Sequence, residues 1–537
     1  MRTIKRMLFV SLIMAMSAMM ALAQSNDDDA AIRDKITNAV MKVYDDQLAK
    51  DPNDYNTLFA RAHQHYYNGE YTAALADVNQ ALLLTPKKDH ELRFDEHILR
   101  ARISEARQDY ASELADLRLA QELQPKSLAC TDMIAKANLK AGNLDAAEKA
   151  FKKILHAESM NYDAMYGLAL VEQQRNNPKA AIEQVDKAVK LFRAEPQVYV
   201  NRADIYIRQG DVNSALQDLL VGMSVGDGGT AAQRLFDLSD SNYDEVMRSL
   251  ADLANTTNDS GMYRYLRASI AMDHCHYAQA LRDLYFIKRN HLYDGSAIYY
   301  NIAKCCVELA RFDEALIHVD QAIEMSPQEP EYYIVKALAE FNAGEGGNFN
   351  AAMQALNRCS EFAPQYVPML LTKAHLLINQ GKEKDGLGYL NAAIANEPTN
   401  AEALFTRAMY FKRHGEANLL SRDLKSLIML SDDVVDLKGF AFNELERDNE
   451  AFNWLSRITS VNEPGGENYY YAAVFMALKG DDYNAIDYLQ KALDKGYGSL
   501  YNLKYNILSP LTLQSLREKP NFALMVDKAQ RNFVESE

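Results

Sequence analysis

A small side chain recurs along this chain at a nearly constant interval. Six of the eleven intervals in the series are 34 residues, and the 65-residue gap after Ala203 fits two repeats, one of them degraded. A fixed period of 20 to 50 residues indicates stacked repeats. The first series is Ala62, Ala101, Ala135, Ala169, Ala203, Ala268, Ala303, Ala337, Ala374, Ala408, Gly439 and Ala473. A second series runs twelve residues behind it, at Ala74, Ala147, Ala181, Ala215, Ala280, Ala315, Gly386, Ala451 and Ala485.

Helical stretches surround the first series, such as Tyr55–Asn68 and Ala297–Leu309, with apolar residues at helical intervals. A break follows, often glycine and then a polar residue, as at Gly69-Glu70 and Gly210-Asp211. Glycine can adopt the left-handed conformation that ends a helix, and aspartate can cap the next one. Small residues at the crossing allow two helix axes to approach to roughly 8–10 Å. The pattern therefore predicts an all-α chain of paired helices.

This pattern resembles the tetratricopeptide repeat family, whose helix–turn–helix unit has a period of about 34 residues. The fullest match lies between Tyr55 and Pro86, through Ala62, Gly69, Tyr71, Ala74, Ala81 and Pro86. The resemblance implies a right-handed α-solenoid of stacked units, with two arrays joined by an irregular segment. Glu113 and Leu420 depart from the family pattern, because they occupy places where the family has a small residue.

The amino terminus carries a second strong signal. Three basic residues precede the apolar run Met7–Leu22, which ends in Ala21-Leu22-Ala23. This arrangement is typical of a signal peptide, residues 1–23, cleaved after Ala23. The apolar run is shorter than the roughly 20 residues that a membrane span needs. We therefore expect an exported, soluble protein without a transmembrane anchor, in the periplasm or outside the cell.

The remaining chain is predicted to form five consecutive parts. An array of repeats needs covers at its ends, because an end repeat otherwise leaves an apolar face in water. The parts are an N-terminal capping helix in 24–53, an N-terminal array in 54–224, an irregular connector in 225–261, a C-terminal array in 262–495 with degenerate units near 425–463, and a C-terminal capping tail in 496–537.

Charge and cysteine content narrow the classes of partner. The formal net charge is −16, and it becomes −19 (−16 − 3) once the three basic residues of the signal peptide are removed. Such an acidic chain repels phosphate backbones, which disfavours nucleic-acid binding.

The five cysteines have no metal-site spacing and are expected to be small core residues, although a Cys275–Cys306 disulfide stays open. The cluster His274-Cys275-His276 lacks a second ligand pair, so we predict no metal and no cofactor.

Catalytic motifs are missing from the sequence. The segment Gly226-Asp227-Gly228-Gly229 lacks the Gly-Lys-Ser/Thr of a phosphate-binding loop, and there is no Gly-x-Ser-x-Gly or His-Glu-x-x-His. Repeats occupy the chain from about residue 54 to 495, which leaves no room for a separate catalytic domain. The sequence therefore favours a non-enzymatic binding scaffold.

The resemblance implies that the first helix of each unit lines a concave face. An apolar stripe on these helices either packs against neighbouring helices or forms a groove for an extended peptide or amphipathic helix. The predicted peptide-binding residues are Tyr166, Val200, Ile207, Tyr265, Met272, Tyr300, Ile334, Phe341, Leu371, Phe405 and Met409. The leading hypothesis is an adaptor of the cell envelope that holds an exported protein or peptide partner. A glycan-binding surface protein and an enzyme stay as alternatives, and the oligomeric state is open.

Overall fold

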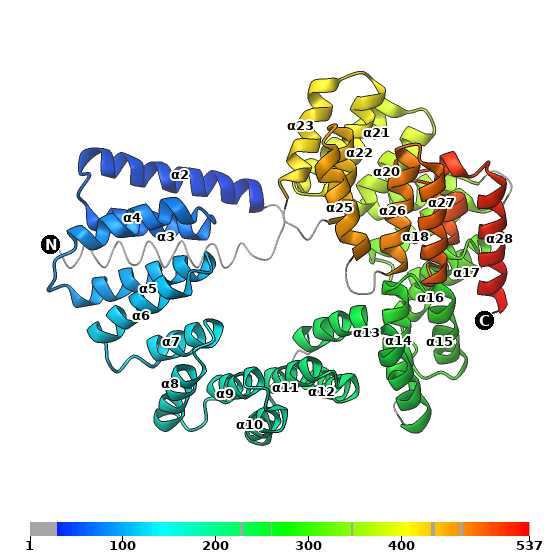
Figure 1. The fold of residues 1–537 in the computed structure, drawn as a ribbon. Coiled ribbons are helices and arrows are strands. Elements are labelled where there is room, and N and C mark those ends of the chain that lie inside the picture. Colours follow the sequence, from blue (N-terminus) through cyan, green and yellow to red (C-terminus); the bar gives the residue numbers. More distant parts are fainter. Residues whose placement is uncertain are drawn as a thin grey trace. The chain divides into compact units, whose positions relative to one another are not determined.

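The computed structural model describes residues 29–225, 229–258, 260–344, 347–430, 435–460 and 465–535, and these residues contain helices and no strand. Figure 1 shows consecutive helices packed as antiparallel pairs. The predicted all-α solenoid of paired helices is therefore confirmed. The chain divides into two compact units, Met1–Val246 (unit 1) and Met247–Glu537 (unit 2). The division falls inside the stretch 225–261 that was predicted to be a connector.

Unit 1 begins its described part with α2 and continues as five helix pairs. Each second helix also packs against the first helix of the next pair. The helix α13 (Gly229–Thr256) has non-helical backbone angles at Asn242 and contains the boundary between the units. The other helices are α2 (Asp29–Lys50), α3 (Tyr55–Tyr67), α4 (Tyr71–Leu84), α5 (His90–Ala106), α6 (Tyr110–Leu123), α7 (Leu128–Lys140), α8 (Leu144–Ala157), α9 (Tyr162–Gln174), α10 (Pro178–Leu191), α11 (Pro196–Gln209) and α12 (Val212–Ser224).

Unit 2 contains seven further pairs and a tail. The pairs are α14 (Ser260–Asp273) with α15 (Tyr277–Arg289), α16 (Ser296–Glu308) with α17 (Phe312–Met325), α18 (Pro330–Asn342) with α19 (Phe349–Ser360), α20 (Val367–Asn379) with α21 (Glu383–Asn396), α22 (Ala401–Arg413) with α23 (Ala417–Ile428), α24 (Val435–Glu444) with α25 (Asp448–Ser460), and α26 (Gly466–Leu478) with α27 (Asp482–Asp494). The tail comprises the π-helix η2 (Tyr501–Tyr505), the 3-10 helix η3 (Gln514–Leu516) and α28 (Pro520–Glu535), which packs against α27.

The small residues of both series lie where the helices of each pair cross. Ala62 and Ala74 are both 0% exposed, and the other members are equally buried. Gly439 shows why the side chain must be small. A Cβ atom at this position would lie 2.0 Å from the ring of Trp454, the only tryptophan of the chain. The recurring small residue therefore reflects close approach of two helices.

The turns between paired helices follow the predicted chemistry only in part. Gly69 and Gly210 have φ angles of 76° and 75°, in the left-handed region that glycine tolerates. The side chain of Asp211 caps α12 by accepting a hydrogen bond from the backbone N–H of Ser214. Glu70 makes no such bond to α4. Glycine therefore ends these first helices in the predicted way, whereas capping of the second helix varies between units.

An arginine clamp joins successive helix pairs and was not predicted. In α11, Arg202 donates to both carboxylate oxygens of Asp218 at 2.7 and 2.6 Å, and to Asp186 of the preceding α10 at 2.7 Å. Arg202 thus binds its own partner helix and the previous pair at the same time. Bidentate bonds of this kind are strong and directional. The same arrangement occurs at Arg61 with Asp77 and Asp45, Arg100 with Asp116 and Asn79, and Arg407 with Asp423 and Asn391.

We expect Arg202→Ala to destabilise unit 1 by about 3 kcal/mol, because it leaves the buried carboxylate of Asp218 without its cation. The measurement is urea unfolding followed by far-UV circular dichroism, with hydrogen exchange of α11 and α12 to localise the effect. Arg208→Ala, on the same helix but exposed, is the control and should change stability by no more than about 0.5 kcal/mol. Equal effects of the two substitutions would contradict a role for the clamp.

Candidate functional site

The predicted groove residues lie on first helices, which contact one another along each unit. In unit 1, α9 contacts both α7 and α11. In unit 2, α18 contacts both α16 and α20, and α24 contacts both α22 and α26. First helices therefore form a continuous layer within these parts of each unit. This layer presents equivalent positions of successive repeats next to one another.

Burial separates the predicted groove residues into two groups. Val200, Leu371 and Phe405 are 4%, 5% and 3% exposed, so they belong to the core. The remaining eight are half-buried: Tyr166, Ile207, Tyr265, Met272, Tyr300, Ile334, Phe341 and Met409. Packing against neighbouring helices, one of the two readings of the stripe, therefore accounts for part of it.

Tyr166 is the half-buried aromatic residue of the predicted stripe in unit 1. Its ring packs against a cluster that includes Ala169, Val185 and Ile205. Burial raises the pKa of Tyr166 to about 12, and the carboxylate of Asp204 adds to the shift. A hydrogen bond between the hydroxyl and the side chain of Asp204 contributes to the same shift, so this hydroxyl already has a partner within unit 1.

In unit 2 the predicted residues come together more closely. The ring of Tyr300 stacks on Tyr332, with centroids 4.9 Å apart and planes inclined by 27°. Burial and, to a lesser extent, Glu331 raise the pKa of Tyr300 to about 12. Ile334 and Phe341 pack against one apolar cluster, of which Leu371 is a member.

The other predicted residues of unit 2 are placed separately. The hydroxyl of Tyr265 accepts a hydrogen bond from Asn301 at 3.2 Å. Phe405 makes an edge contact with Phe440, with ring centroids 6.3 Å apart. Met272 and Met409 lie half-buried on α14 and α22.

The C-terminal tail reaches the core of unit 2, a contact that sequence reasoning missed. Leu508 packs against the cluster that holds Leu371. The tail also covers the last pair, where Lys519 forms an ion pair with Asp482 at 2.7 Å. In addition, Ser499 donates to Glu308 of α16 at 2.6 Å, across 191 residues of sequence. The sequence marks where the tail begins, at Gly496-Tyr497-Gly498, but contains no periodic signal for what it contacts.

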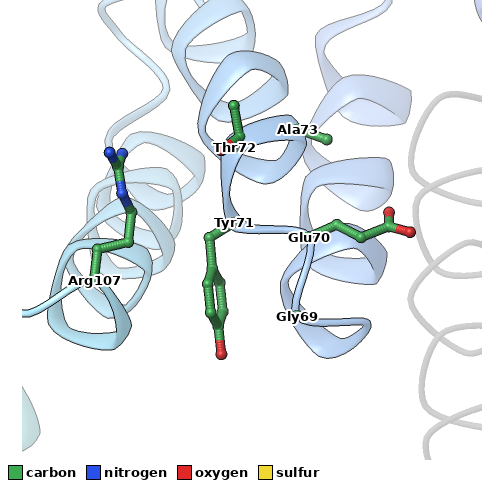
Figure 2. A pocket seen from close by; sticks show the side chains of 6 residues that line it. All are labelled: Gly69, Glu70, Tyr71, Thr72, Ala73 and Arg107. Carbon is green, nitrogen blue, oxygen red and sulfur yellow. The ribbon is translucent and has the colours of Figure 1, made fainter. Parts of the chain in front are cut away.

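Two surface hollows of unit 1 lie at turns between helices. Figure 2 shows one of about 440 Å³, where Tyr71 lies between Arg107 and the turn at Gly69-Glu70. A second, of about 520 Å³, lies at Gln124–Ser127. Both are open to solvent, and neither includes a predicted groove residue.

The cysteines and the histidine cluster have structural contacts. All five cysteines are buried free thiols, so Cys275 and Cys306 do not form a disulfide. Burial raises the pKa of the Cys275 thiol and lowers the pKa of His274. His276 donates from Nε2 to the backbone oxygen of Lys495 at 3.0 Å. These contacts hold the turn between α14 and α15 against the start of the tail.

Two predictions concern residues outside the described ranges. The signal peptide in 1–23 lies there, and so do Gly226, Asp227 and Gly228 of the glycine-rich segment. Among the described helices, none combines the length and the apolar character that crossing a bilayer requires.

A comparison of the sequence with models of protein families agrees with the fold of stacked helix pairs. A family model described as a tetratricopeptide repeat matches residues 133–196, 169–221 and 265–330. The matched segments are tetratricopeptide repeats. These matches cover helix pairs of both units, and tetratricopeptide repeats imply a protein–protein interaction scaffold. The fold is typically non-catalytic.

Two curated relatives share parts of the repeat region. Mouse interferon-induced protein with tetratricopeptide repeats 3 is 25% identical over 126 residues, which cover 23% of this chain and 31% of the relative. The tetratricopeptide repeat and J domain-containing co-chaperone DNJ1 of Fusarium oxysporum is 34% identical over 86 residues, 15% of this chain and 16% of that protein. The chain thus spans less than a third of the length of either relative.

Solved structures overlap weakly with the whole chain. A tetratricopeptide repeat protein from Parabacteroides merdae has 16% identity and a TM-score of 0.24, covering 46% of this chain and 99% of the other. YrrB, described as a tetratricopeptide repeat protein with an unusual peptide-binding site, has 12% identity and a TM-score of 0.27, covering 36% and 96%. The fold assignment rests on the helix pairs and the family model.

One second-series position carries a charge in place of the usual small residue. Glu113 is 3% exposed, and its Oε2 atom has no hydrogen-bond partner among the described residues. Burial raises the pKa of Glu113 to about 7, with Glu105 adding to the shift and Lys140 opposing it. Above pH 7 the folded protein therefore holds an unsatisfied carboxylate in the core of the α5–α6 pair.

We expect Glu113→Gln to stabilise the protein at pH 8 by on the order of 1 kcal/mol. The folded state binds this proton more tightly than the unfolded chain, so the wild-type free energy of unfolding falls as pH rises from 4.5 to about 7. The gain from the substitution should shrink towards pH 5. Urea midpoints at pH 5 and pH 8 measure it, with the exposed Glu122→Gln on the same helix as control. A gain in stability that does not depend on pH would contradict the raised pKa of Glu113.

Proposed function

We propose that this protein is a non-enzymatic scaffold of the cell envelope, which holds a peptide or helix of an exported partner along the layer of first helices. The observation that carries the proposal is the continuity of that layer, because successive first helices contact one another. Equivalent side chains are thereby presented at regular intervals, as an extended ligand requires.

The half-buried residues of the stripe support a binding role. A side chain that is half-buried is already held in place by its own repeat, so little conformational entropy is lost when a partner covers the rest. Tyr166 and Tyr300 place aromatic side chains at two of these half-buried positions. Tyrosine is enriched where proteins bind one another.

Location in the envelope is supported by the sequence of residues 1–23. The basic start, the apolar run and Ala21-Leu22-Ala23 are the parts of a signal peptide. The partner is accordingly an exported protein, present in the same compartment. Fractionation of cells and N-terminal sequencing of the mature chain test this part, with Gln24 expected as the first residue.

We expect Tyr300→Glu combined with Phe341→Glu to abolish partner capture, because two charges are placed on an apolar face that the partner must desolvate. The measurement is capture from envelope extract followed by mass spectrometry, with helix content checked by circular dichroism. The control is Ile317→Glu, on the second helix α17, where the side chain is already 61% exposed. Unchanged capture by the double variant would place the binding face elsewhere.

A photocrosslinking residue tests the same face without adding charge. We expect p-benzoylphenylalanine at Tyr166 or Tyr300 to crosslink the partner, because both positions lie on first helices. The same residue at Leu83 or Ile317, which are 86% and 61% exposed on second helices, is the control. Equal crosslinking from inner and outer positions would argue against a groove.

A further inference from the structure

Four polar side chains of α15 and α17, in unit 2, are joined by successive hydrogen bonds. The Nζ atom of Lys288, in the last turn of α15, lies 3.4 Å from Nδ1 of His318 on α17. On the other side of the imidazole ring, Nε2 lies 3.2 Å from the hydroxyl oxygen of Tyr285. That hydroxyl also bonds the carboxylate of Glu314. Lys288, His318, Tyr285 and Glu314, in that order, are called the relay below.

The chemistry of lysine fixes the direction of these hydrogen bonds. An ammonium group has donors and no acceptor, so Lys288 donates and Nδ1 of His318 accepts. The hydrogen of a neutral imidazole is then on Nε2, which donates to the oxygen of Tyr285. The hydroxyl of Tyr285 in turn donates to the carboxylate of Glu314. A proton that leaves Lys288 can therefore pass along the relay until Glu314 is protonated, and His318 and Tyr285 end neutral.

The relay begins and ends at the surface and passes through the interior. His318 is 5% exposed, whereas Lys288 and Glu314 are half-buried. The ring of Tyr299 on α16 covers one side of the amine, with its centroid 5.1 Å from Nζ. The amine of Lys288 is therefore accessible to a small molecule, while the imidazole behind it is shielded from water.

The surroundings favour the neutral form of the amine. Burial lowers the pKa of Lys288, and the charge of Arg289 adds to the lowering, while Glu314 and Cys306 oppose it. Burial and the charge of Lys288 also lower the pKa of His318, so its imidazole is neutral and has a lone pair for a proton. A neutral amine beside a proton acceptor is the arrangement that makes lysine a nucleophile.

Positive charge surrounds the amine on the solvent side. The exposed Arg289 follows Lys288 directly, and its guanidinium lies 5.4 Å from the centre of the Tyr285 ring. At the other end of the relay, Arg311 lies 3.6 Å from Glu314. A guanidinium binds carboxylate and phosphate groups in preference to neutral ones. A reactive molecule that carries an anionic group is therefore attracted to Lys288 more strongly than an uncharged one.

We propose that Lys288 is a modification site that forms an imine with small aldehydes carrying an anionic group. Arg289 binds the anion, and His318, Tyr285 and Glu314 move the protons. The inference goes beyond the scaffold role and does not depend on the groove of first helices.

The reaction balances without an oxidant or a reductant. The relay takes one proton from the ammonium of Lys288, and the nitrogen lone pair then bonds to the aldehyde carbon while the C=O electron pair moves to oxygen. The relay returns its proton to that oxygen. The nitrogen then loses two protons in turn, one of which restores the relay. The other leaves with the hydroxyl as water when the C=N bond forms and the C–O bond breaks.

The test treats the full-length protein with glyoxylate, an aldehyde that carries a carboxylate. Sodium cyanoborohydride reduces the imine to a stable secondary amine, and peptide mass spectrometry locates the product. We expect Lys288 to be modified at pH 7 at least about tenfold faster than Lys336, a half-buried lysine of the same unit that forms an ion pair with Asp320 at 2.6 Å. Equal rates at the two lysines would overturn the proposal.

Tyr285→Phe interrupts the relay and keeps the ring, so the rate at Lys288 should fall at least about tenfold at pH 7. The loss should shrink at pH 10.5, because an ordinary lysine loses its proton near pH 10.4 without an acceptor. Tyr299→Phe, which keeps the ring that faces Lys288, is the matched control and should leave the rate unchanged. Circular dichroism checks that both variants are folded. A loss that is equal at the two pH values, or no loss at all, would overturn the role of the relay.

A comparison of two aldehydes tests the class of ligand. We compare the rate of modification of Lys288 by glyoxylate with the rate by propionaldehyde, which has no charge. Arg289→Gln should lower the ratio of these rates about threefold, the size of effect that an exposed ion pair provides. Arg282→Gln, an exposed arginine on the same helix, is the matched control and should leave the ratio unchanged. An unchanged ratio in Arg289→Gln would overturn the preference for an anionic aldehyde.

Discussion

Close approach of two helices is the constraint on which the rest of this structure depends. Ala62 and Ala74 are fully buried, and at Gly439 even one methyl group would meet the ring of Trp454. Larger apolar side chains around the crossing also pack against the next pair, as in the cluster that contains Phe151 of α8 and Leu168 of α9. Each pair therefore needs neighbours, and the result is an array of stacked pairs.

The arginine clamp adds direction to this packing. Arg202 contacts Asp218 in its own pair and Asp186 in the preceding pair, so one planar guanidinium fixes the relation of three helices. Apolar contacts are not directional, and they tolerate small rotations of one pair against the next. Bidentate hydrogen bonds to a buried carboxylate do not tolerate such rotations, because a rotation would leave the charge without its partner. We infer that the clamp fixes the register between pairs where it occurs.

The tail adds contacts to the core of unit 2 that the helix pairs do not supply. Leu508 packs against the same cluster as Leu371, one of the residues predicted to line the groove. Leu371 is only 5% exposed, so this contact joins the tail to the core of unit 2. In unit 1 the half-buried Tyr166 belongs to a first helix that contacts its neighbouring first helices on both sides.

The sequence by itself determined the helix pairs, their turns and their repeat, because these depend on residues close together in the chain. Ala203 and Gly210 show this: a small residue at the crossing and a left-handed glycine seven positions later are local signals that recur with the period. Only the tertiary structure decided that Val200 is core rather than groove, and that Glu113 is an unsatisfied buried carboxylate. The tertiary structure alone decided that Ser499 contacts Glu308. These residues are 191 positions apart, so their contact depends on how all the intervening helix pairs stack, and the repeat period of the sequence does not specify that arrangement.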